Sequence, residues 1–179
     1  MHLVTRFFAS LWARPLDAAT IAWVAEVLEP PEQQSFDEMP RADRAEAVDV
    51  ARRAERALAP TPAAADPRWL AAALLHDAGK QASGFGTVGR AAVTAVAVAV
   101  GDGRVRGWVT SPKPVPARMG RYIAHDDLGA ELLRDRGARP EVVAWAGAHH
   151  RPGLWPTTGI PPEVCRALAA ADGEPIEGR

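Results

Sequence analysis

The sequence predicts an all-α fold that forms one compact unit. Alanine and arginine, which favour helices, recur throughout, whereas the alternation of β-branched and polar residues that marks strands is scarce. Several segments carry apolar residues at helical spacing, and prolines and glycines stand between these segments. With 179 residues, the chain fits a single domain that buries about two thirds of the surface of its unfolded form.

The first predicted helix covers residues 17–28. It follows Pro15, and the proline pair at 30–31 is expected to end it. The next predicted helix covers residues 43–58, where apolar positions recur at helical spacing with charged residues between them. This pattern predicts a helix with one face in the core and the other in water.

Two apolar segments follow a connection rich in proline. Residues 68–79, "RWLAAALLHDAG", predict a buried helix that Gly79 can terminate. Residues 86–100 contain many valines, but their length and alanines favour a helix over a strand. The apolar run within them, residues 91–100, is well short of the roughly 20 residues that a membrane helix needs. We therefore expect it to be a buried core segment.

Residues 101–121 are expected to be partly irregular. They contain three prolines, four glycines and five basic residues against one acid. This composition fits either a solvated connection or a flap that attracts phosphate. Residues 122–137 and 139–150 then predict two helices joined through a glycine, and residues 161–172 predict a last helix.

Composition excludes several classes of protein. A net charge of −1 with 24% charged residues predicts no general attraction to nucleic acid or to an acidic membrane. A nucleic-acid role would rest on residues 101–121 alone. The single cysteine, Cys165, excludes an internal disulfide and a multi-cysteine zinc site, and it suits a reducing compartment. An arginine interrupts the apolar patch near the N-terminus, which argues against a signal peptide. We therefore expect a cytoplasmic protein.

The histidines are not scattered along the chain. Of five, His2 is expected to be an ordinary surface residue, and the other four lie near the ends of predicted helices with acids close by. These four histidines and the acids close to them are His76, Asp77, His125, Asp126, Asp127, His149, His150 and Asp172. Helical bundles build metal sites from histidines and carboxylates that project inward from several helices. Adjacent side chains on a helix point about 100° apart, so we expect one of the neighbours His149 and His150 to bind a metal and the other either to serve the substrate or to support the metal ligands.

The order of these residues resembles the HD-domain superfamily of metal-dependent phosphohydrolases, over about residues 36–174. The matching blocks are "LLHDAGK", "HDDLGAELL", "AGAHHRP" and "LAAAD". In that family an early histidine, the His-Asp pair and a late aspartate bind one divalent ion, and histidines between them hold a second ion. The resemblance assigns these metal ligands to His76, Asp77, His125, His149, His150 and Asp172. It implies an HD-type helical domain at residues 36–179, with residues 1–35 as an N-terminal helical extension packing on it.

One block departs from the family pattern. Where the family has an aspartate, an arginine, any residue and the first histidine, this chain has "DRAE", with Glu46 in place of the histidine. Glu46 is therefore either a ligand in an oxygen-rich site that favours magnesium, manganese or iron(II), or a sign of a weakened or lost metal. Taken alone, it is also an ordinary solvated helix charge. We expect one or two divalent ions, among Mn, Fe, Mg and Ni.

The resemblance implies hydrolysis of a nucleotide or another small phosphomonoester or phosphodiester by metal-activated water, with Asp77 between the ions. Lys80 follows His76 by one turn, so it either directs a positive charge at the phosphate or interacts with the helix dipole. Arg118 and Arg121 precede His125 and are further candidates for binding substrate. The alternative function is a catalytically degenerate HD fold that binds a phosphorylated ligand or a protein partner.

The substrate is not assigned by the motifs. "GLWP" after the histidine pair lacks the tyrosine of the cyclic-dinucleotide branch, and "HDAGK" lacks the acidic residues of the (p)ppGpp branch. The chain resembles stand-alone bacterial members, which implies fold and metal only. Trp145 and Trp155 stand near the histidine pair, either as core residues or as walls of a base pocket.

Overall fold

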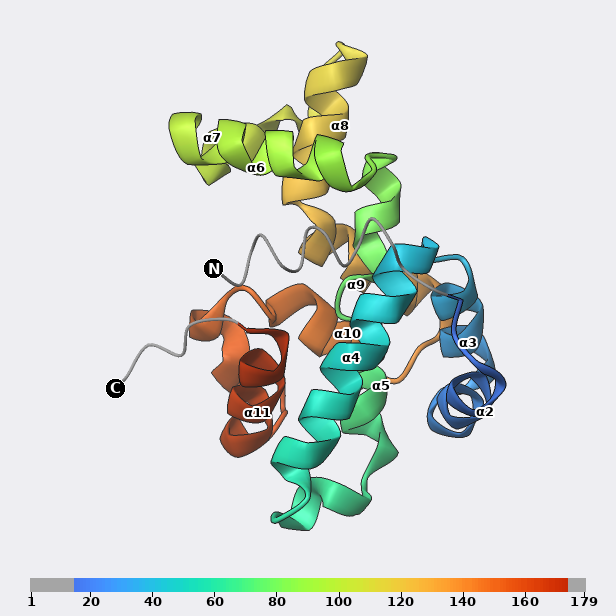
Figure 1. The fold of residues 1–179 in the computed structure, drawn as a ribbon. Coiled ribbons are helices and arrows are strands. Elements are labelled where there is room, and N and C mark those ends of the chain that lie inside the picture. Colours follow the sequence, from blue (N-terminus) through green and yellow to red (C-terminus); the bar gives the residue numbers. More distant parts are fainter. Residues whose placement is uncertain (1–14, 174–179) are drawn as a thin grey trace.

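The structure, a computed structural model, describes residues 15–173, and within that range every regular element is a helix (Figure 1). The predicted all-α class is therefore confirmed. The α-helices are α2 (Ala18–Val27), α3 (Pro30–Asp37), α4 (Arg41–Leu58), α5 (Pro67–Leu75), α6 (Thr87–Val100), α7 (Asp102–Arg106), α8 (Pro114–Ile123), α9 (His125–Arg136), α10 (Pro140–Ala148) and α11 (Pro162–Asp172). The 3₁₀ helices are η1 (Pro62–Ala65), η2 (Ala78–Ser83), η3 (Gly107–Thr110) and η4 (Pro152–Thr157).

Helix α5 lies at the centre of the main hydrophobic core. It packs against α4, α10 and α11, and its residues from Ala71 to Leu75 are all buried. Helix α4 presents its predicted apolar face to α5 and α11, through residues such as Ala51 and Ala54. The small alanine side chains on both helices allow close approach, so α5 delivers the residues that follow it to the middle of the bundle.

The N-terminal part contains a helix that the sequence did not predict. Prolines 30 and 31 follow α2, but they also open α3, because proline fits the first turn of a helix. Glu32 of α3 is fully buried and accepts hydrogen bonds from the backbone N–H and the Nε of Arg139, at 3.1 and 2.9 Å. This contact ties α3 to the start of α10. His2 and the N-terminal apolar patch lie outside the described residues.

Helices α6, α7 and α8 form a lobe at one end of the bundle (Figure 1). The lobe has a small core of its own, centred on Val93, Ala97 and Val105. The prediction that α6 is a helix is confirmed, but the prediction that it is buried is wrong: Val98 is 81% exposed. The lobe covers only one stripe of α6, so an apolar sequence alone did not determine burial here.

Residues 101–121 also differ from expectation, because they are mostly helical. They form α7, η3 and most of α8, with Ser111–Lys113 as the break before α8. Gly120 of α8 packs directly on η3: a Cβ there would lie 2.2 Å from the amide nitrogen of Val109. The glycines and prolines of this stretch therefore serve close packing and helix starts as well as turns.

Within residues 15–173, no single helix is long and apolar enough to cross a membrane; α5 with η2 and α6 meet such a test only as a joined pair, bent by 86°, on length and composition alone.

Candidate metal centre

His76 and Asp77 occupy the turn between α5 and η2, just beyond the end of α5. The sequence placed them in the last turn of that helix. Asp77 has φ −103° and ψ 10°, in the sparsely populated bridge region where many active-site residues occur. Both side chains are buried, with 1% and 6% exposure. The turn thus brings a basic ring and a carboxylate into the interior together.

Three histidine rings are oriented by the same local hydrogen bond. In each, Nδ1 lies close to the backbone carbonyl oxygen three residues earlier. The pairs are His76 with Ala73 at 2.8 Å, His125 with Tyr122 at 2.7 Å, and His149 with Ala146 at 2.8 Å. A carbonyl oxygen only accepts, so Nδ1 donates and a neutral ring leaves the lone pair on Nε2. Metal-binding histidines are held by this kind of contact.

The three Nε2 atoms converge on Asp77 from different elements. His125 Nε2 lies 3.2 Å and His149 Nε2 lies 3.7 Å from Asp77 Oδ1. His76 Nε2 lies 3.2 Å from Asp77 Oδ2 and 3.4 Å from Oδ1 of Asp172, the last residue of α11. The site therefore assembles only when α5, α9, α10 and α11 pack together.

Four atoms of this cluster are buried and have no hydrogen-bond partner: Asp77 Oδ1 and the Nε2 atoms of His76, His125 and His149. When Nδ1 is the donor and the ring is neutral, Nε2 and the carboxylate oxygens face one another as acceptors. Buried acceptors without a donor are costly, and a cation between them satisfies all of them. This donor set, imidazole nitrogens and carboxylate oxygens, fits a divalent metal ion.

The two sides of the cluster differ in electrostatic character. Burial opposes the charge of His76, but the carboxylates of Asp77 and Asp172 raise its pKa well above the ordinary value. Burial lowers the pKa of His149 well below the ordinary value, and the neighbouring rings of His76 and His150 act in the same direction. Negative charge therefore favours the charged form of His76, whereas burial and the neighbouring rings favour the neutral form of His149.

His149 and His150 both reach the cluster. One ligand atom from each of Asp77, His125, His149 and His150 lies within 4.8 Å of the others. Because α10 ends at Ala148, the two histidines are not on a continuing helix, and their ring centres are only 4.0 Å apart. This differs from the expectation that only one of them reaches the centre. His149 is buried and His150 is exposed, so His150 lies at the solvent side of the site.

Lys80 borders the Asp77 carboxylate, and the charge of Glu46 acts on Lys80. The Lys80 side chain is 18% exposed, and its ammonium forms an ion pair with Asp77 Oδ2. Burial opposes its charge, but the negative charges of Asp77 and Glu46 raise the pKa of Lys80 above its ordinary value. The same ammonium and His76 help to hold the pKa of Asp77 well below its usual range, against the effect of burial. Glu46 is half-buried on α4.

A protein-family model described as HD domain matches residues 46–174 of the chain. The match covers well over half of the sequence and starts at Glu46. The chain belongs to the HD domain family. Neither the comparison with curated proteins nor the comparison with solved structures found a match.

Gly79 helps to position His125, one of the candidate metal-binding residues of the HD domain. It lies in η2 without a positive φ, so it does not terminate α5 as the sequence suggested. A Cβ on Gly79 would lie 2.0 Å from the carbonyl oxygen of His125 and 2.5 Å from the amide nitrogen of Gly129. Its missing side chain therefore lets η2 pack directly on the first turn of α9, which brings His125 to Asp77.

Arg118 and Arg121, predicted to bind substrate, lie on α8 and contact backbone carbonyls around the end of η2. Arg118 donates to Ser83 at 2.9 Å and to Gly84 at 2.5 Å, and its guanidinium lies 4.3 Å from the centre of the Phe85 ring. Arg121 donates to the Ala82 carbonyl at 3.0 Å. These contacts hold the lobe to η2, and the role in substrate binding stays a prediction.

We expect Arg118→Ala to lower the free energy of unfolding by about 1–3 kcal/mol, because it removes charged hydrogen bonds to two carbonyls. Urea denaturation measures this change. Lys113→Ala, on an exposed residue of the same lobe, is the control and should be near neutral. An Arg118 variant with unchanged stability and a raised KM would contradict the structural role and support substrate binding.

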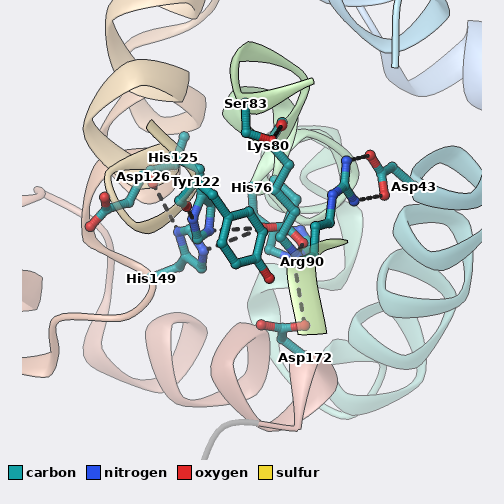
Figure 2. Close-up of polar contacts among 12 residues, drawn as sticks. Asp43, His76, Lys80, Ser83, Arg90, Tyr122, His125, Asp126, His149 and Asp172 are labelled. Atoms are coloured by element: carbon teal, nitrogen blue, oxygen red, sulfur yellow. Dashed lines mark hydrogen bonds and ion pairs between the residues drawn. The ribbon is translucent and has the colours of Figure 1, made fainter. Parts of the chain in front are cut away.

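The structure adds residues that the sequence reasoning did not select. Tyr122 stacks beside His125, with ring centres 6.0 Å apart and planes 25° apart. Arg90 of α6 forms a two-pronged ion pair with the buried Asp43, one turn before Glu46 (Figure 2). Asp43 belongs to the "DRAE" block, so that motif held a signal. Neither Arg90 nor Tyr122 belongs to such a motif. Both lie on helices of the lobe, and the packing of the lobe brings them to the site.

Proposed function

We propose that the chain is a metal-dependent phosphohydrolase that acts on a nucleotide or another small phosphomonoester or phosphodiester. The observation that carries the proposal is the set of buried acceptor atoms on His76, Asp77, His125 and His149, each ring already oriented by its own backbone hydrogen bond. Preorganised ligands of this kind keep their geometry when an ion binds. Mn, Fe, Mg and Ni all accept such nitrogen and oxygen ligands.

A divalent ion at this site supplies charge for a phosphate oxygen and acidifies water. The protein contributes the rest. The carbonyls of Ala73, Tyr122 and Ala146 fix the rings. Burial of Asp77 keeps bulk water from its carboxylate, which strengthens its attraction for cations. Lys80 adds a positive charge next to Asp77, placed to neutralise a phosphate that approaches the site.

A small substrate is the expected ligand. The groups around Asp77 that suit a phosphate are Lys80 and Arg90, and the Tyr122 ring beside His125 is available to a base or sugar. Trp145 is 2% exposed and packs against the His149 ring, so it is a core residue. The indole N–H of Trp155 donates to the Ala148 carbonyl at 3.1 Å. We keep a cytoplasmic location as part of the proposal, on the basis of cysteine usage.

The test is metal analysis together with an activity panel. Protein purified without chelators should contain a divalent metal and should hydrolyse members of a panel of nucleotides and simple phosphoesters in the presence of Mn²⁺. Treatment with a chelator should remove the activity, and Mn²⁺ should restore it. Substoichiometric metal combined with no turnover on the panel would contradict the proposal.

The second candidate, a degenerate HD domain that binds a phosphorylated ligand or a protein, is favoured by one observation. Glu46 occupies the position of the family's first histidine in the sequence motif, and its charge acts on the Lys80 ammonium, which forms an ion pair with Asp77. The variant Glu46→His separates the candidates. Hydrolysis that appears only in the variant identifies the natural site as degenerate, whereas an active wild type identifies Glu46 as compatible with catalysis.

A further inference from the structure

The two oxygens of the Asp77 carboxylate face different surroundings. Oδ1 faces the Nε2 atoms of His125 and His149, at 3.2 and 3.7 Å. Oδ2 faces His76 Nε2 at 3.2 Å and the Lys80 ammonium. Asp77 therefore divides the cluster into an Oδ1 side and an Oδ2 side.

The Oδ2 side already contains a cation supplied by the chain. The Lys80 ammonium contacts Oδ2 itself, and the charge of Glu46 acts on it from α4. Asp172, which contacts His76 at 3.4 Å, adds a further carboxylate on this side. A lysine that touches the ligating oxygen and a metal ion on the same oxygen exclude each other, because both need its lone pairs and both are positive.

The Oδ1 side has the composition of a metal site instead. Its ligand atoms, from Asp77, His125, His149 and His150, lie within 4.8 Å of one another. Oδ1 and two of the ring nitrogens are buried without a hydrogen-bond partner. Three imidazoles with one carboxylate bind Mn²⁺, Fe²⁺, Ni²⁺ and Zn²⁺ well.

We propose that this chain holds one divalent ion, on the Oδ1 side, and that the Lys80 ammonium takes the place of a second ion on the Oδ2 side. Glu46 is then the partner of Lys80: a carboxylate at this position attracts an ammonium, whereas a neutral histidine would not. The inference rests on the metal-binding part of the proposed function and goes further, since it assigns the number and position of the ion and the role of the Glu46 substitution.

The experiment counts Mn²⁺ ions without measuring turnover. Chelator-stripped protein is equilibrated with Mn²⁺ alone, bound metal is measured by mass spectrometry, and electron paramagnetic resonance reports whether the bound ions are isolated or spin-coupled. Wild-type protein should bind one ion per chain with an isolated-ion spectrum. Lys80→Met, which keeps the length of the side chain and removes its charge, should gain a second ion with a coupled spectrum. Lys113→Met, on the chain's other lysine, is the control and should bind one.

Two further variants locate the ion. His149→Gln should weaken Mn²⁺ binding at least about tenfold, as expected for a lost ligand, whereas Asp172→Asn should keep the ion. Circular dichroism checks that each variant is folded. If Lys80→Met does not fold, Lys80→Gln is used in its place.

Two ions in the wild type, one ion in a folded Lys80 variant, or loss of the ion in Asp172→Asn but not in His149→Gln would each overturn the inference. The count is independent of catalysis. One bound ion without turnover would contradict the proposed hydrolase activity and agree with this inference. Two bound ions with turnover would contradict this inference and agree with the proposed hydrolase activity.

Discussion

Replacement of Asp77 by asparagine is expected to lower kcat/KM for phosphoester hydrolysis by at least about 100-fold. Loss of a group that merely supports a metal ligand costs 10- to 100-fold in metal affinity or activity, and among residues 15–173 Asp77 is the carboxylate that faces all three oriented histidine rings. Asparagine has the same shape but a neutral amide, so the cluster loses the charge that draws a cation between the rings. Bound metal per chain should fall together with kcat/KM.

Asp127→Asn is the matched control for Asp77→Asn. Asp127 is an aspartate at the start of α9, next but one to His125, but it is 52% exposed and pairs with Arg106 and Arg151. Its replacement should change kcat/KM and metal content little, since exposed ion pairs contribute about 1 kcal/mol or less to stability. If Asp77→Asn retains metal and wild-type activity, the cluster is not the catalytic centre.

Gly79→Ala is expected to lower the free energy of unfolding by about 3 kcal/mol or more, at the upper end of the cost of overpacking. The added Cβ would meet backbone atoms of α9, at 2.0 Å from the His125 carbonyl oxygen, and backbone cannot swing away as a side chain can. Either η2 or α9 must shift, and the shift separates His125 from Asp77. Metal affinity should therefore fall as well.

Gly103→Ala is the control for the glycine variant. Gly103 lies in α7, and a Cβ there meets nothing within 4 Å. Alanine is the better helix former, so this variant should be neutral or more stable by up to about 1 kcal/mol. Thermal and urea denaturation, with Mn²⁺ titration of the folded protein, compare the two variants. Equal stabilities for them would refute the close contact between η2 and α9.

Much of the fold follows from local sequence signals. The charged and apolar pattern of α4 predicted both its helix and its buried face, because a 3.6-residue period separates core from solvent along one element. Two expectations failed for reasons beyond local sequence. The proline pair at 30–31 both follows one helix and starts another. Burial of α6 depends on which neighbouring helices cover it, and the other elements of the lobe cover only a small part of its surface.

Which side chains gather in the candidate cluster followed largely from the sequence, while their roles in binding and catalysis stay predictions. The sequence selected His76, Asp77, His125, His149 and Asp172, and the structure brings them together. Sequence did not predict the common hydrogen bond that orients the rings, nor the two-sided surroundings of Asp77. Both depend on where each helix stops, and helix ends are the least predictable part of an element. The packing role of Gly79 depends on the approach of α9, a contact between distant parts of the chain.

The spread of the ligands along the chain gives the site a role in folding thermodynamics. Its side chains come from the end of α5, the start of α9, the end of α10 and the end of α11, so an unfolded chain has no comparable site. An ion on the Oδ1 side that binds only the assembled bundle would act as a reversible cross-link between three of these helices, α5, α9 and α10. At a free concentration 100 times its Kd, it adds about 2.7 kcal/mol to the free energy of unfolding. If the site binds a metal as proposed, metal supply would raise the free energy of unfolding, independently of any reaction that the site performs.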